Sequence, residues 1–154
     1  MFKRIFFLIL FLNISSCDSP KYLKFHDFNN GWVEAETLSF EFNGDFETKM
    51  ADLSFILRHN NEYSFSNIFL ITEFSANGNL IDIDTIEFKL ANYRGEWLGN
   101  KKISVIEHVL PYKKGLIFDN SNYKLNIRTS MRSKNKVTEI ERLEGIVNFG
   151  LLID

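Results

Sequence analysis

The chain has 154 residues, and its 18 basic and 20 acidic residues give a formal net charge of −2. This near balance gives no electrostatic reason to expect nucleic acid or anionic lipid headgroups as partners. Cysteine occurs once, at Cys17. With that thiol modified, as argued next, none remains for a disulfide, a redox couple or a zinc site.

The N-terminus has the layout of a secretory signal. Lys3 and Arg4 precede an apolar run over residues 5–12, and residues 13–16 lead into Cys17. The run is far shorter than the roughly 20 residues that span a bilayer. Residues 14–17, Ile-Ser-Ser-Cys, resemble a bacterial lipobox, in which the cysteine is acylated and becomes the new N-terminus. Cleavage by the ordinary signal peptidase, or a buried free cysteine, are the alternatives.

We therefore predict a signal peptide over residues 1–16, a lipidated tether over 17–21, and a single domain over 22–154. A domain of about 140 residues can form its own core. Several acyl chains on Cys17 would make release from the membrane very slow, because each buried methylene contributes roughly 0.8 kcal/mol.

The composition and the apolar pattern predict strands. Phenylalanine occurs 16 times, and Phe, Ile, Tyr and Thr suit pleated, half-buried surfaces. Residues 38–43 alternate strictly, Asn77-Gly78 is a tight hairpin signal, and the apolar phase changes at Asp84-Thr85, which suggests a bulge or a bend. The other predicted strands cover residues 53–58, 67–74, 103–110, 123–128 and 145–153, with Pro111 ending one of them and a turn at residues 113–115.

These elements predict an all-β fold of about eight or nine strands, an antiparallel β-sandwich or a jelly roll. The one helical candidate, residues 92–97, is too short to change that class. No βαβ alternation and no internal repeat is present.

No residue constellation indicates catalysis or a cofactor. His26, His59 and His108 fall on different elements without a ligand partner at a suitable spacing, and His59 is interpreted as a surface or turn histidine. Metalloprotease, phosphate-loop and nucleophile-elbow signatures are absent. Asp82 and Asp84 could bind calcium through carboxylate oxygens, although such pairs are more often only solvated.

Aromatic residues offer the remaining candidate sites. Trp97 lies between Gly95 and Gly99, where a tight bend turns the ring inward as a plug or outward toward a partner; Trp32 has the same two readings. A shelf of exposed aromatic rings would support sugar binding. Its candidate members are Tyr22, Trp32, Tyr63, Tyr93, Trp97, Tyr112 and Tyr123.

Several segments, taken in order, resemble the gliding-motility lipoprotein family GldH of the Bacteroidota. The residues that carry the resemblance are Cys17, Gly31-Trp32 before Leu38-x-Phe40, Leu57-Arg58-His59-Asn60-Asn61-x-Tyr63-x-Phe65-x-Asn67-Ile68, Asp84-Thr85, Leu90-Ala91, Gly95-x-Trp97-x-Gly99, Tyr123-x-Leu125-x-Ile127, Met131-Arg132 and Leu143-x-Gly145-Ile146-x-x-x-Gly150. They cover nearly the whole mature chain. One departure is that Asn100-Lys101-Lys102 follows the bend where the family usually has more glycines.

The resemblance implies a non-enzymatic accessory lipoprotein of the gliding and type IX secretion apparatus, whose partners are other envelope proteins. We expect attachment to the outer rather than the inner membrane. The candidate interaction surface comprises Arg58, Tyr63, Arg94, Trp97 and Asn100, since aromatic residues and arginine are favoured at interfaces. The alternative is a surface-exposed glycan-binding lipoprotein of a polysaccharide-uptake system, which requires exposed, coplanar aromatic rings. An envelope hydrolase is a third reading, without any supporting residues.

Overall fold

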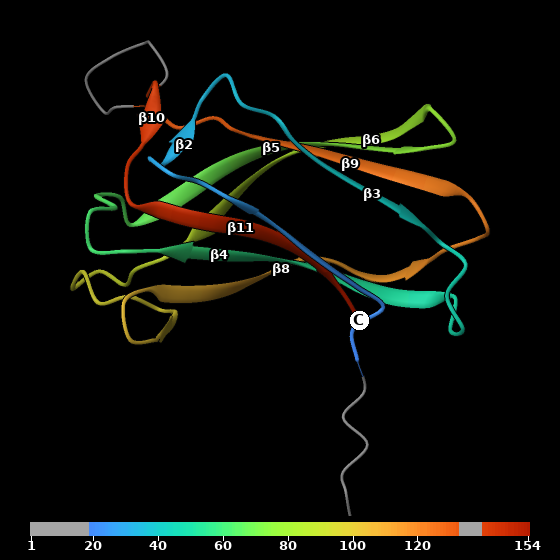
Figure 1. Cartoon of the computed structure of the whole chain (residues 1–154), viewed down its shortest axis with the longest axis horizontal. Helices are drawn as coiled ribbons and strands as arrows, with labels where there is room; N and C mark the ends of the chain where they lie inside the picture. The colour runs from blue at the N-terminus through green and yellow to red at the C-terminus, as the bar shows by residue number, and fades with distance from the viewer. Residues whose placement is uncertain (1–18, 133–139) are drawn as a thin grey trace, which may run out of the picture.

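The computed structural model describes residues 19–132 and 140–154, and in that part of the chain it contains eleven strands and no helix (Figure 1). Cys17 and the predicted signal peptide lie outside the described residues. No helix in the described part is long and apolar enough to cross a membrane. The strands are β1 (Tyr22–Asp27), β2 (Trp32–Val33), β3 (Leu38–Asn43), β4 (Met50–His59), β5 (Asn67–Ala76), β6 (Asn79–Lys89), β7 (Asn100–Lys101), β8 (Ile106–Ile117), β9 (Asn122–Thr129), β10 (Arg142–Leu143) and β11 (Ile146–Ile153).

The strands form two main antiparallel sheets in jelly-roll order. One sheet has the order β1-β11-β4-β8-β7 and the other β3-β9-β5-β6, while β2 and β10 form a short ribbon. Among the eight long strands the first pairs with the last, the second with the seventh, the third with the sixth and the fourth with the fifth. This nested pairing is that of a jelly roll. The predicted fold class is confirmed.

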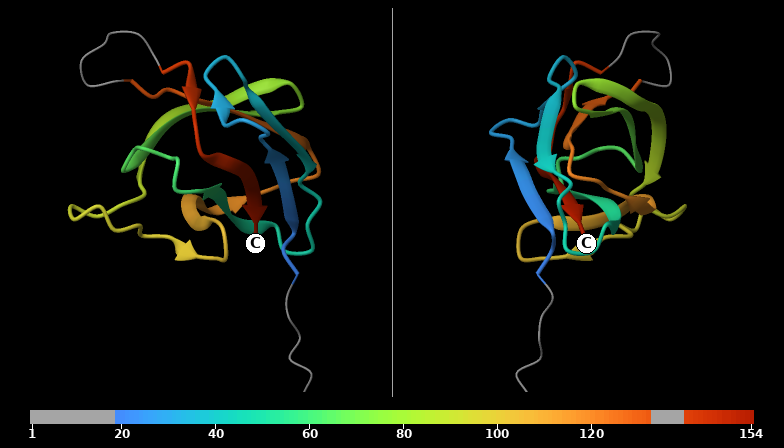
Figure 2. Two further views of the ribbon diagram at one scale, coloured as in Figure 1. Left: turned by 60° about the vertical axis from the view of Figure 1, so that its left-hand side comes forward. Right: turned by 90° about the vertical axis from the view of Figure 1, so that its right-hand side faces the viewer.

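The core lies between the two sheets, which Figure 2 shows as facing layers. Phe55 of β4 and Phe149 of β11 are fully buried, with ring centroids 5.3 Å apart. Phe40 of the opposite sheet reaches Phe149 at 6.5 Å. Alternating buried and exposed residues along β3, β4 and β9 follow the period of two that the sequence shows.

The β5–β6 hairpin forms at the predicted turn. Asn77 and Gly78 have φ angles of 49° and 80°, as a tight hairpin loop requires. β6, however, continues through Asp84-Thr85, and the register shift in this pair lies opposite Phe74 and Ser75. The predicted break at Asp84-Thr85 is therefore wrong.

The strand predicted over residues 103–110 has different bounds in the structure. β8 begins at Ile106 and continues past Pro111 to Ile117. Its partner on the outer side, β7, pairs only as far as Glu107. Beyond that point β8 is an edge strand, where a residue without a backbone N–H is tolerated. The predicted end at Pro111 and the predicted turn at residues 113–115 are wrong for this reason. Residues 92–97 form a turn rather than a helix.

The sandwich has two distinct ends (Figure 1). We call the end that carries the turns at residues 44–49, 77–78 and 118–121 the tether end, because Tyr22 begins β1 there, paired with Ile153. The opposite end carries residues 28–31, 60–66, 90–105 and 144–145, and we call it the loop end.

Candidate interaction surface at the loop end

Two buried histidines form the base of the loop end. His59 ends β4 and His108 lies on the neighbouring β8, and both side chains point into the sandwich. Their Nε2 atoms are 3.0 Å apart, and Nδ1 of His59 is 2.9 Å from the carbonyl oxygen of Asn60. Because a carbonyl only accepts, Nδ1 of His59 carries the proton, so His108 donates from Nε2 to Nε2 of His59.

Burial keeps this pair neutral. It lowers the pKa of His108 to about 4, with a further contribution from the nearby His59. Burial also lowers the pKa of His59, opposed by the bond to the Asn60 carbonyl. The interpretation of His59 as a surface or turn histidine is wrong, because the segments after β4 and before β7 fold back over the end of the strand.

Trp97 and Tyr63 cover the histidines. The Trp97 ring packs on His59 at 4.3 Å between centroids, and the half-buried indole plugs the loop end, as one of its two predicted readings requires. Tyr63 is only 2% exposed and donates from its hydroxyl to the carbonyl oxygen of Asn67 at 2.7 Å. Burial raises its pKa. Tyr63 therefore lies beneath the surface on which it was predicted.

A glycine turn allows this closure. Gly145 has a φ of +81°, a conformation that favours glycine. A Cβ at this position would collide with the backbone nitrogen of Tyr63. The Gly145 carbonyl accepts from the backbone of Asn60 at 2.8 Å, so the segments 60–63 and 144–146 are joined directly.

Arg58 lies outside this cluster, on the outer face of the sheet. Its Nε donates to Glu107 at 2.7 Å, and Lys102 approaches the same carboxylate at 3.6 Å. The Arg58 hydrogen bond is the main cause of the lowered pKa of Glu107. Asn100 is exposed and pairs with Glu107 across β7 and β8.

The loop between β6 and β7 and the turn between β7 and β8 carry the most exposed large apolar side chains of this end. Tyr93 is 90% exposed, and the Arg94 guanidinium lies 5.3 Å from its ring centroid. Leu98 and Ile103 are also exposed. We define the loop-end surface as Arg58, Tyr93, Arg94, Leu98, Asn100 and Ile103. Arg58, Arg94 and Asn100 were predicted for an interaction surface from the sequence, and Tyr93 was named there only as a possible sugar-binding ring. Leu98 and Ile103 were not singled out, because their exposure cannot be read from the apolar pattern.

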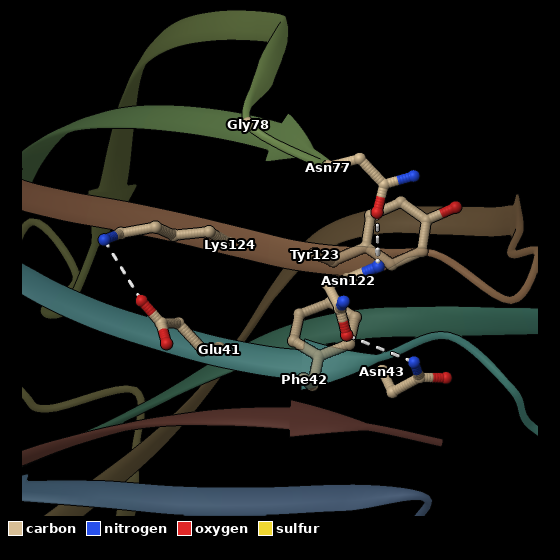
Figure 3. A pocket seen from close by; sticks show the side chains of 8 residues that line it. All are labelled: Glu41, Phe42, Asn43, Asn77, Gly78, Asn122, Tyr123 and Lys124. Atoms are coloured by element: carbon tan, nitrogen blue, oxygen red, sulfur yellow. Dashed lines mark hydrogen bonds and ion pairs between the residues drawn. The ribbon is translucent and has the colours of Figure 1, made fainter.

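A cavity of about 550 Å³ lies at the tether end and is lined by asparagines together with Phe42 and Tyr123 (Figure 3). Its asparagines bond to one another: Asn43 donates to Asn122 at 3.2 Å, and the Asn122 backbone donates to Asn77 at 3.0 Å. Phe42 and Tyr123 stack at 5.6 Å with their rings largely covered. The cavity therefore offers hydrogen-bonding groups but no exposed aromatic ring.

The seven aromatic residues considered for sugar binding do not form a shelf. Trp32 is fully buried and stacks on Phe28 at 5.3 Å. Of the seven, only Tyr93 is strongly exposed. The exposed, coplanar pair that glycan binding requires is not formed by these residues.

Asp82 and Asp84 already have a cationic partner. Nζ of Lys113 on β8 lies 2.7 Å from Asp82 and 2.6 Å from Asp84. Its hydrogen bond is the main cause of the lowered pKa of Asp82. Lys113 occupies the position that calcium would need. Among the described residues no group of three or more potential ligands could hold a metal ion.

The chain is an all-β jelly-roll domain, and comparison with known sequences defines its family. Residues 21–153 match the model of the GldH lipoprotein family, and the chain belongs to that family. It is 37% identical to a gliding motility lipoprotein GldH homolog of Christiangramia forsetii, over all of this chain and 94% of that protein. It is 30% identical to the gliding motility lipoprotein GldH of Flavobacterium johnsoniae, over 96% and 92%. The resemblance inferred from the sequence is confirmed.

Solved structures are more distant. The infectious bursal disease virus VP2 subviral particle has a TM-score of 0.38 at 14% identity, covering 89% of this chain and 34% of that one. This similarity is too low to define a relationship.

Proposed function

We propose that this protein is a non-enzymatic accessory component of the gliding motility and type IX secretion apparatus, held at the cell envelope by acylated Cys17. The observation that carries the proposal is the family match over residues 21–153, which includes both sheets and both ends. Two relatives of nearly equal length are named gliding motility lipoproteins. In this proposal, acylated Cys17 anchors the protein in the outer membrane.

The contacts at the loop end support a structural role. Histidines and carboxylates are the common general acids and bases of enzymes, and here they are engaged with other protein groups. His59 and His108 bond to each other, and Glu107 is bound by Arg58 and Lys102. The exposed side chains of this end include Leu98, Ile103 and Tyr93, and the Arg94 guanidinium lies over the Tyr93 ring.

In the proposed mechanism the lipid anchor keeps the domain beside its envelope partners. Confinement to a membrane raises the effective concentration, so that a modest interface suffices for assembly. The loop-end surface provides that interface. Its apolar residues project from a rigid base, because the histidine pair and Trp97 fix the loop from beneath.

The proposal is tested by recovering partners from gently solubilised envelopes with the tagged, acylated protein. We expect gliding or type IX secretion components in the wild-type sample, and a reduced yield with Arg94→Glu combined with Ile103→Asp. The matched control is Lys124→Glu at the tether end, where the lysine makes only an exposed ion pair with Glu41 at 3.1 Å.

Recovery of the bait alone, or of polysaccharide-uptake proteins, would contradict the proposal. Gliding on agar and secretion of type IX cargo in cells that carry only the variant gene give the functional readout. Loss of both by the loop-end variant, with the protein still in the membrane fraction, is the expected result.

A further inference from the structure

The outer face of the five-stranded sheet carries an apolar surface whose centre, at Ile56, is buried by its neighbours and whose outer members, Leu23, Val109 and Pro111, are exposed. The strand register places two adjacent rows of side chains across β1, β11, β4 and β8, all facing away from the core. The first row is Leu23, Leu152, Ser54 and Pro111, and the second is Phe25, Gly150, Ile56 and Val109. We call these eight residues the outer patch.

None of the eight side chains is charged, and the Arg58 guanidinium that lies over the Phe25 ring is paired with Glu107. Leu23 is 47% exposed and Val109 52% exposed, at opposite sides of the patch. Antiparallel sheets with one solvated face normally place polar residues there. The next row toward the loop end is polar, and it includes the Arg58–Glu107 ion pair.

Gly150 makes room for the Phe25 ring on the outer face of the sheet. A Cβ at this position would approach the Phe25 ring to 2.7 Å. Without it the ring lies directly over β11, and the Arg58 guanidinium lies 4.5 Å from the ring centroid. An apolar surface edged by a polar row suits the boundary between lipid headgroups and acyl chains, where amphipathic surfaces dock.

The tether places this patch next to the lipid anchor. Four residues lie between Cys17 and Tyr22, and the five Cα–Cα steps that join them span at most about 18 Å when fully extended. Leu23 is the next residue, and the four strands of the patch are about 14 Å across at the usual strand spacing. In Figures 1 and 2 the start of β1 lies beside the C-terminal end of β11, away from β5 and β6.

We propose that the outer patch lies against the bilayer to which Cys17 is anchored, with Leu23 and Val109 inserted at the headgroup level. The chemical occupant is the lipid interface itself. Because the patch is uncharged, the contact does not depend on anionic lipids or on salt. Anchoring supplies the effective concentration, so a shallow insertion that would be weak for a free domain is sustained. The proposal depends on acylation of Cys17 and not on the proposed gliding role.

The test places an environment-sensitive fluorophore on each face of the sandwich. Val109→Cys labels the outer patch, and Thr85→Cys labels an exposed strand position on the outer face of the four-stranded sheet. Acylated Cys17 leaves the introduced thiol as the only free one. Full-length acylated protein is reconstituted in phosphatidylethanolamine–phosphatidylglycerol vesicles that carry a nitroxide in the upper acyl chain.

We expect the Val109 probe to be quenched several-fold more than the Thr85 probe, with the same ratio at low and high salt. A Leu23→Cys label gives an independent second reading, because Leu23 is also exposed and tolerates labelling. Equal quenching at the two faces would overturn the proposal, and so would a difference that high salt removes. Protection of the Val109 probe by envelope proteins, but not by vesicles, would assign the patch to a protein partner and overturn it as well.

Discussion

The two ends of the sandwich are closed by aromatic clusters of different chemistry. At the tether end the rings of Phe42, Phe46, Phe118 and Tyr123 pack at 5.0–6.2 Å, and asparagines and the Asp119 carboxylate lie around them. At the loop end the rings of Tyr63 and Trp97 pack on a pair of neutral histidines. The first end combines apolar burial with the hydrogen bond from Tyr123 to the Asp119 carboxylate, while the second depends on keeping two bases unprotonated. Acid should therefore act on different groups at the two ends, a carboxylate at the first and the histidine pair at the second.

The largest expected effect is a cavity at the tether end. Phe118 is almost completely buried, and its ring contacts Phe42, Phe46 and Tyr123. Phe118→Ala should lower the free energy of unfolding by about 3–5 kcal/mol, the range found for buried aromatic truncations. Trp97→Ala should lower it by roughly half as much, since that ring is only half buried. Urea unfolding followed by circular dichroism measures both; equal losses would contradict this ranking.

The second prediction compares alanine substitutions at Gly145 and Gly78, which separates the cost of backbone strain from the cost of a steric clash. Gly145 and Gly78 have nearly the same φ, +81° and +80°, so alanine is strained at both, by about 1–2 kcal/mol. Only at Gly145 does the added methyl group meet the backbone of Tyr63. Gly145→Ala should therefore be destabilising by a further ~1–3 kcal/mol. The difference between the two unfolding midpoints measures the collision, and identical midpoints would mean that segment 60–63 yields without loss.

The third prediction concerns pH and the loop end. The lowered pKa values of His59 and His108 mean that the unfolded chain binds protons more readily than the folded protein. Their contribution is fully present above pH 6.5, the ordinary histidine pKa, and is lost as the pH falls toward 4. The thermal midpoint should therefore decrease from pH 7 to pH 4.5.

The matched variant is His108→Gln, which retains a donor for Nε2 of His59 but does not titrate. Its midpoint should be lower at pH 7 and should fall less steeply with acid. A slope as steep as that of the wild type would show that carboxylates, and not the histidine pair, set the pH dependence.

The sequence predicted the features that local chemistry determines. Asn77-Gly78 specified a hairpin through its tolerance of positive φ, and the alternation in β3 and β9 specified which residues face the core. The jelly-roll class followed from several alternating segments without helices. These signals are readable because each depends on residues close together in the chain.

The missed features depend on register between distant strands. His59 and His108 are 49 residues apart, and only the pairing of β4 with β8 brings them together. Likewise Asp82 and Asp84 on β6 face Lys113 on β8 of the other sheet. Because side chains alternate along β6, Ile83 between them points to solvent. That ion pair accounts for the apolar phase change that suggested a break in β6. A pattern that counts only apolar residues cannot contain this information.

The smallest expected effect compares one hydroxyl at each end. Tyr63 donates to the carbonyl of Asn67 at 2.7 Å beneath the loop end, and Tyr123 donates to the carboxylate of Asp119 at 2.8 Å at the tether end. Tyr63→Phe should lower the free energy of unfolding by about 1–2 kcal/mol, because the carbonyl is left without this donor in a buried place. Tyr123→Phe should lower it by less than about 1 kcal/mol, since water can replace the hydroxyl at the exposed Asp119. Chemical denaturation of both variants measures the two losses in free energy of unfolding. If the two losses are equal, water reaches the Asn67 carbonyl, and the loop end is more open than the packing of Tyr63 and Trp97 implies.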